Sequence, residues 1–142
     1  RKNTINQKSI NYECLEFHEF SFPQSASIIM SYYTMQFIRP RYRQEFINKV
    51  YENLEWGGAF FLFEKIRAPD ARFQDYAQQV YNDFKLRNGY SVEEIYKKTE
   101  SLRGVLEPFS ENGNIGMFER AGFSDYTTLY HNLSFRGWLL IK

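Results

Sequence analysis

The stretch from residue 25 to residue 63 limits the possible folds more than any other part of the chain. A short apolar run at 27–30 is followed by the segment Tyr-Tyr-Thr-Met-Gln, an amphipathic helical pattern, two glycines and a second apolar run. This order predicts a strand, a polar strand end, a crossover helix and a parallel strand. It is half of a doubly wound α/β sheet, whose ligands bind at the carboxyl ends of the strands. No Gly-x-Gly loop precedes it, so the part of such a fold that grips a cofactor is expected upstream of Arg1 or not at all.

Composition excludes several classes of protein. The 142 residues are enough for one domain with a core, and a formal net charge of +1 disfavours direct nucleic-acid binding. Cys14 is the single cysteine, which excludes a disulfide framework and favours a reducing compartment, with the cytoplasm as the expected location. The longest apolar runs, at 60–63 and 138–141, are too short to span a bilayer, so no membrane segment is predicted.

Apolar periodicity and capping signals predict the order of elements. Strands are expected at 10–17, 27–30, 60–66, 126–133 and 135–141, the last two as an antiparallel pair. The strand at 27–30 is expected to be central and covered on both faces. Helices are expected from Pro40 to the Gly57-Gly58 pair, from Asp70 to Asn88-Gly89, from Ser91 onward, at 102–106, and from Glu111 to Ala121.

Polar residues at three expected strand ends are the candidates for a site. They are His18 and Glu19 after the first strand, Tyr32, Tyr33 and Gln36 after the second, and Glu64 with Lys65 after the third. In a doubly wound sheet these positions converge on one crevice. Other interpretations remain open: His18 as a loop histidine without a ligand, one tyrosine in the core and one on the surface, and Glu64 as a solvated strand end.

The usual catalytic constellations are absent from the sequence. There is no zinc-ligand spacing and no Gly-x-Ser-x-Gly elbow, which disfavours a triad hydrolase and predicts no metal site. Lys85 and Arg87 either reach into the crevice or are ordinary charges at a helix end. The arginines at 39, 41 and 43 surround Pro40 and are interpreted as a solvated cluster.

Three segments carry a resemblance to a known family. They are ASIIMSYYTMQFI at 26–38, the turn WGGA at 56–59 leading into a strand that ends in Glu64-Lys65, and DFKLRNGYS at 83–91. They resemble the class I S-adenosylmethionine-dependent methyltransferases, in the branch of the carboxy-S-adenosylmethionine synthases of tRNA wobble-uridine modification. The likeness extends from about Tyr12 to Lys142. It implies an α/β, Rossmann-like domain over 1–142 that supplies the third to seventh strands, carries a helical cap at 70–108 and lacks the glycine-rich front half.

The resemblance also implies a cofactor and site residues. S-adenosyl-L-methionine is the expected cofactor, with His18, Glu19 and Tyr32 at its site and Glu19 accepting a hydrogen bond from the adenine amino group. The substrate pocket is expected to include Tyr33, Gln36, Arg87, Tyr90 and Met117. Tyr32 stands where the carboxy-S-adenosylmethionine synthases have an asparagine, and Met117 is aligned with the arginine that pairs with the transferred carboxylate. Because a thioether cannot replace a guanidinium in such a pair, this alignment disfavours carboxyl-group chemistry.

Three functions remain open from the sequence. The first is methyl transfer to a small-molecule or RNA-modification-related acceptor, which requires the protein mainly to align nucleophile and sulfonium and to exclude water. The second is carboxy-S-adenosylmethionine synthesis. The third is a non-catalytic module that dimerises through the aromatic helical cap, since its many large rings must be buried against something.

Overall fold

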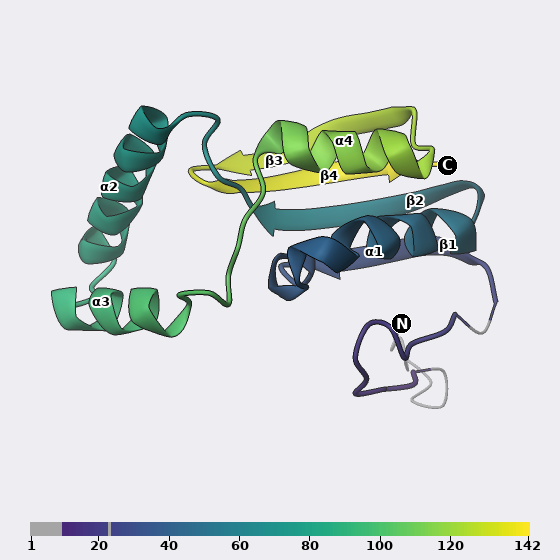
Figure 1. Ribbon diagram of the computed structural model, residues 1–142, viewed down its shortest axis with the longest axis horizontal. Coiled ribbons are helices and arrows are strands. Elements are labelled where there is room, and N and C mark those ends of the chain that lie inside the picture. Colours follow the sequence, from purple (N-terminus) through teal and green to yellow (C-terminus); the bar gives the residue numbers. More distant parts are fainter. Residues whose placement is uncertain (1–9, 23) are drawn as a thin grey trace, which may run out of the picture.

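A four-stranded mixed sheet forms the centre of the molecule (Figure 1). The computed structural model describes residues 10–22 and 24–142. Strand β1 (Ala26–Tyr32) pairs in parallel with β2 (Leu54–Lys65), which pairs antiparallel with β4 (Phe135–Ile141). Strand β4 also pairs antiparallel with β3 (Asp125–Asn132), which gives the order β1-β2-β4-β3. The predicted crossover and the predicted C-terminal antiparallel pair are confirmed.

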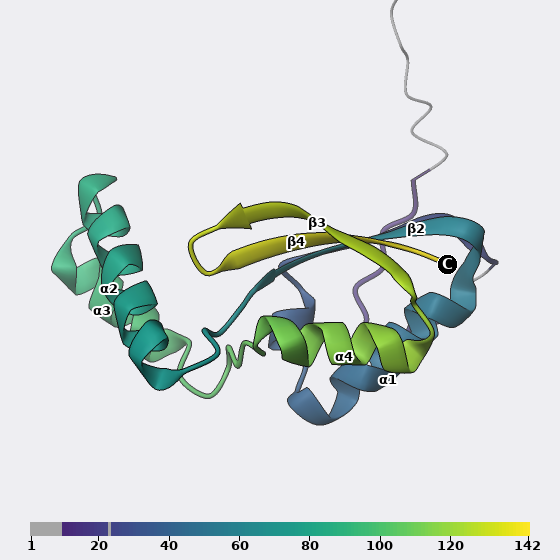
Figure 2. The same ribbon diagram turned by 90° about the horizontal axis from the view of Figure 1, so that it is seen from above.

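One face of the sheet carries the hydrophobic core. Helices α1 (Pro40–Asn53) and α4 (Glu111–Ala121) lie on the same side of the sheet, as Figure 2 shows. Alternate residues of β2, such as Phe60 and Leu62, point toward these helices and are fully buried. The core is completed by Ile47 and Val50 of α1, Met117 and Phe118 of α4, and Phe123, Trp138 and Leu140.

The opposite face of the sheet is open within the described residues. On β1, the side chains of Ile28, Met30 and Tyr32 are 65%, 61% and 62% exposed. Their partners in register on β2 include the half-buried Phe61 and Phe63. The prediction that this strand is central and covered on both faces is therefore wrong for the described residues, because β1 is an edge strand with one face covered. We call this exposed apolar surface of β1 and β2 the open face.

The predicted first strand is not formed. Residues 10–16 have no regular structure and 17–19 form a turn, so within residues 10–22 and 24–142 the sheet has four strands where the resemblance implies five. Instead, the segment packs on α1, where the rings of Phe17 and Phe46 meet edge to face at 4.9 Å. Lys49 of α1 donates a hydrogen bond to the carbonyl of Phe20. A segment with loose alternation gains no ladder hydrogen bonds without a neighbouring strand, so side-chain packing decides its path.

Two element boundaries also differ from the prediction. Helix α1 ends at Asn53, before the glycine pair, because the backbone of Leu54 is already extended and its side chain is buried. The glycines lie within β2, where the register with β1 shifts between Ala26 and Ile28. Gly57 adopts φ 76° there, a conformation that suits glycine at an irregularity. The piece expected at 102–106 is a turn, not a helix.

The segment 70–108 projects away from the sheet (Figures 1 and 2). Helix α2 (Ala71–Arg87) begins at Asp70, whose side chain accepts a hydrogen bond from the backbone of Arg72, and α3 (Val92–Ser101) begins with the predicted capping box of Ser91 and Glu94. No residue of α2 is buried, although its apolar stripe follows helical spacing. Within the described residues, none of the helices combines the length and the apolar character needed to cross a membrane.

Candidate functional site

Two cavities lie beside the carboxyl ends of β1 and β2. The first, here called the N-terminal pocket, has a volume of about 820 Å³ and lies between the segment 15–20 and the start of α1. The second, here called the cap pocket, has a volume of about 440 Å³ and lies between the sheet and the helices α2 and α3. Both volumes are in the range of small-molecule sites.

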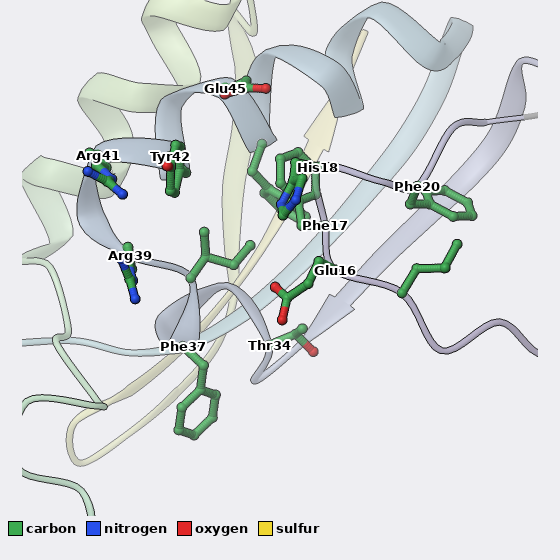
Figure 3. A pocket seen from close by; sticks show the side chains of 13 residues that line it. Glu16, Phe17, His18, Phe20, Thr34, Phe37, Arg39, Arg41, Tyr42 and Glu45 are labelled. Atoms are coloured by element: carbon green, nitrogen blue, oxygen red, sulfur yellow. The ribbon is translucent and has the colours of Figure 1, made fainter.

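The N-terminal pocket combines aromatic rings with a few charges. Figure 3 shows Glu16 and His18 on one side, Thr34 below them, and Arg39 and Arg41 across the cavity. Phe17, Phe20, Phe37 and Tyr42 add ring surface to the lining. A flat heteroaromatic ring with an amino group matches this chemistry, because rings offer stacking surfaces and a carboxylate accepts from the amino group.

A strained loop connects β1 to the short helix η2 (Met35–Phe37). Tyr33 adopts φ 53°, a left-handed conformation that is costly for a residue with a side chain, and its N–H donates to the carbonyl of Phe63 at 2.8 Å. The rings of Tyr32 and Tyr33 meet at 4.5 Å, and Tyr32 also contacts Phe63 at 5.4 Å. Burial raises the pKa of the Tyr33 phenol. The loop is thus held at the end of the sheet by its neighbours.

A buried polar cluster lies beneath this loop. The side-chain oxygen of Gln36 accepts from the backbone N–H of Lys65 at 2.8 Å, which ties η2 to the end of β2. Glu64 is 2% exposed, and burial raises its pKa to about 8 although Arg43 and the backbone N–H groups of Met35 and Gln36 act in the opposite direction. The burial of this side chain excludes the interpretation of a solvated strand end.

The cap pocket is lined by cations. Five basic side chains face it, and none of the described residues that line it is acidic; the five are Lys65, Arg67, Lys85, Lys98 and Arg103. Their amino and guanidinium groups come from β2, α2, α3 and the two connecting segments. Such a concentration of positive charge in a concave site attracts an anion, above all a carboxylate or a phosphate.

Two of these lysines have their ammonium groups near the same aromatic ring. The Nζ atoms of Lys65 and Lys85 lie 5.0 Å and 4.5 Å from the ring centroid of Tyr81. Burial lowers the pKa of Lys65, and the positive charge of Lys85 lowers it further. An anion between the two ammonium groups would relieve this repulsion, so the pocket gains from binding one.

The structure brings together only part of the predicted site. His18 lines the N-terminal pocket, but Glu19 does not, and Glu16 takes its place in the lining. Tyr32 lies on the open face, and Gln36 lines the cap pocket. The three predicted strand-end positions therefore lie beside two neighbouring cavities and not around a single crevice.

Four predicted substrate-pocket residues lie outside both cavities. Tyr33, in the loop after β1, lines neither of them. Arg87 and Tyr90 are exposed at the end of α2 and line neither pocket. Met117 is 2% exposed in the core between α1, α4 and the sheet, so it does not face a substrate. Because Met117 is buried in the core, its apolar side chain is no evidence against carboxyl-group chemistry.

Sequence reasoning missed the basic residues of α3 and the turn after it. Lys98 and Leu102 are four residues apart, and Thr99 and Arg103 repeat that spacing, which is typical of residues on one side of a helix. In the structure the first residue of each pair lies in α3 and the second in the turn after it, and all four line the cap pocket. The spacing is readable in the sequence, but the surface it faces is set by the fold of the cap, which no local signal predicts.

Solved structures define the class of the fold. The chain is similar to human N-acetylserotonin methyltransferase in complex with SAM, with a TM-score of 0.61 and 12% identity over 95% of this chain and 34% of that one. It is also similar to the S-adenosylmethionine-dependent methyltransferase SibL, with a TM-score of 0.58 and 13% identity over 92% of this chain and 35% of that one. The fold is that of part of a class I S-adenosylmethionine-dependent methyltransferase.

Sequence relatives point to one group within this class. No protein-family model matches the chain. The carboxy-S-adenosyl-L-methionine synthase of Staphylococcus epidermidis is 38% identical over 99% of this chain and 61% of that protein, and the synthase of Campylobacter lari is 38% identical over 87% and 53%. The chain is thus a relative of the carboxy-S-adenosyl-L-methionine synthases and spans about three fifths of the first of these two in length.

Proposed function

We propose that these residues are part of an S-adenosyl-L-methionine-dependent transferase of the carboxy-S-adenosyl-L-methionine synthase type. The cap pocket carries the proposal, because five basic side chains without an acidic neighbour in its described lining suit a carboxylate-bearing substrate. The sequence relatives bear this name, and the burial of Met117 removes the objection to carboxyl-group chemistry.

The N-terminal pocket fits the adenosyl part of the cofactor. Its rings would flank adenine, and Glu16 would accept a hydrogen bond from the amino group. When bound, the cofactor supplies an activated sulfonium. The residues described here would hold the adenosine, hold the anionic substrate at the cap pocket and exclude water between them. The product would serve tRNA wobble-uridine modification in the cytoplasm.

Calorimetry on the longest natural chain that contains these residues tests the cofactor. We expect binding of S-adenosyl-L-methionine, and a chain with an intact front half that does not bind it would overturn the proposal. Mass spectrometry after incubation with small carboxylic acids then separates the two chemistries. A carboxylated sulfonium supports synthase activity, whereas transfer of a methyl group to an acceptor supports methyltransferase activity.

The anion site proposed in the cap pocket predicts a role for Lys98 in binding a carboxylate. Replacement of Lys98 by glutamine should weaken the binding of citrate, used as a carboxylate probe, by about tenfold, because one charge-assisted hydrogen bond is lost. Lys97→Gln is the matched control, since Lys97 lies next in sequence but pairs with Glu93 at 2.6 Å and does not line the pocket. Equal citrate affinities of the two variants in calorimetry at low salt would contradict an anion site.

A second candidate function is assembly through the cap. Helix α2 exposes an apolar stripe in which Phe73, Tyr76, Val80 and Phe84 are 57%, 68%, 50% and 46% exposed. Such a stripe favours a partner surface, and we propose a homodimer through it. Light scattering should then show a dimer, and Tyr76→Glu should convert it to a monomer. A monomeric parent protein would contradict the dimer.

A further inference from the structure

Arg43 is buried, although the two arginines just before it in the sequence are exposed. Only 2% of its surface is accessible, whereas Arg39 and Arg41 are exposed at the start of the same helix. The interpretation of all three as a solvated cluster is therefore wrong for Arg43. A buried guanidinium carries a large desolvation cost, which lowers the pKa of Arg43. Its position therefore requires compensating contacts.

Those contacts come from two segments that are distant in sequence. Nε donates to the carbonyl of Ile38 at 2.8 Å and Nη2 to the carbonyl of Gln36 at 2.9 Å, both in the connection from β1 to α1. Nη1 donates to the carbonyl of Glu107 at 2.6 Å, in the segment that returns from the cap. The guanidinium also lies 4.6 Å from the ring centroid of Phe109. One side chain thus holds both segments.

Both segments line the cap pocket. Gln36 and Phe37 line it from the β1 side, and Leu106 and Pro108 line it from the returning segment. Each wall is therefore within two residues of a carbonyl that Arg43 holds. Two acidic side chains act on Arg43, the buried Glu64 and the exposed Glu107, and both favour its charged form.

We propose that Arg43 is a positioning residue that joins the connection after β1 to the segment returning from the cap and so sets the spacing of the cap-pocket walls. An apolar side chain of similar volume fills the same space but leaves three carbonyls without their donor and the walls without a link. The effect on anion binding rests on the proposed function, whereas the link between the two segments does not.

Hydrogen exchange on the longest natural chain that contains these residues tests the link. In Arg43→Lys, which keeps the charge beside Glu64 but cannot reach three carbonyls, we expect amide exchange to become about tenfold faster in 36–38 and in 106–109 together. Gln36→Ala removes the side-chain acceptor of the Lys65 N–H, so exchange should become faster at Lys65 and in 36–38 but stay unchanged in 106–109. Arg41→Lys is the matched control and should change neither segment.

The outcomes separate the link from the proposed function. Faster exchange in only one segment, or an equal rise that includes the core strand β4, would overturn the positioning role. Citrate affinity should fall at least fivefold in Arg43→Lys at an unchanged Lys98, because the walls no longer hold their spacing. If the parent chain binds no citrate while the exchange pattern appears as expected, the link stands and the proposed anion site fails. If citrate binding is unchanged in Arg43→Lys despite the exchange pattern, the role in setting the pocket is overturned.

Discussion

Replacement of Glu64 by glutamine is expected to remove most of the pH dependence of stability between about pH 4.5 and pH 8. Burial raises the pKa of Glu64 from 4.5 to about 8, so the folded chain keeps a proton that the unfolded chain releases in this window. The free energy of unfolding is then highest below the unfolded pKa and falls as the pH rises, by up to about 1.4 kcal/mol per pH unit. The total change is on the order of 5 kcal/mol.

Urea unfolding over a pH series measures this effect. The amide that E64Q introduces stays neutral at every pH, so this variant should match the parent protein near pH 5 and exceed its stability at pH 8. Glu45→Gln is the matched control, because Glu45 is exposed on α1 and should leave the slope unchanged. A parent-like slope in E64Q would mean that another group carries the titration, or that Glu64 is ionised in the fold through its neighbours Arg43 and the N–H groups of η2.

The helices and the parallel crossover were predictable because local signals agree with the tertiary fold. The capping box at Ser91, the cap at Asp70 and the left-handed Gly122 all mark helix ends where the sequence predicts them. Each of these signals acts within one turn of the helix, so it does not depend on distant residues. The core stripe of α1 follows the same logic, since helical spacing alone brings Ile47 and Val50 to one side.

The prediction of a first strand at 10–17 was wrong for the opposite reason. A strand is stabilised by its neighbour, and the residues at 10–16 have no neighbour to pair with in the described chain. The exposed face of β1 has the same origin: an apolar run indicates burial but does not say what buries it. Ile28 and Ile29 look alike in the sequence, yet only Ile29 packs against the core.

The residues of the candidate site were likewise predictable where local signals sufficed and not where distant contacts decide. Strand-end logic found His18, Gln36, Glu64 and Lys65, which lie at the two cavities or directly beneath them. Met117 was named from the family resemblance, and an alignment alone does not say which side of α4 a residue faces; the side chain is buried in the core. The burial of Arg43 was also missed, since an arginine that follows two exposed arginines has no local mark of its long-range partners.

The two faces of the sheet should respond very differently to truncation of a large side chain. Phe118→Ala is expected to cost about 3–5 kcal/mol in the free energy of unfolding, because the ring is fully buried and leaves a cavity. Its edge-to-face contacts with Trp138 at 5.6 Å and Tyr126 at 6.0 Å are lost as well. In the 142-residue chain, Met30→Ala on the open face should cost only about 0.5 kcal/mol, because Met30 is 61% exposed.

The same two substitutions in a longer natural chain test whether the rest of the fold covers the open face. The curated relatives extend beyond the matched region, since this chain covers 61% of the Staphylococcus epidermidis protein. If additional strands and helices of such a protein pack on the open face, Met30→Ala should there cost about 2 kcal/mol or more, while the cost of Phe118→Ala stays the same. Chemical denaturation of both variants in both chains measures the four values. An unchanged small cost of Met30→Ala in the longer chain would show that the open face is not where the rest of the fold packs, and would favour a separate partner for that surface.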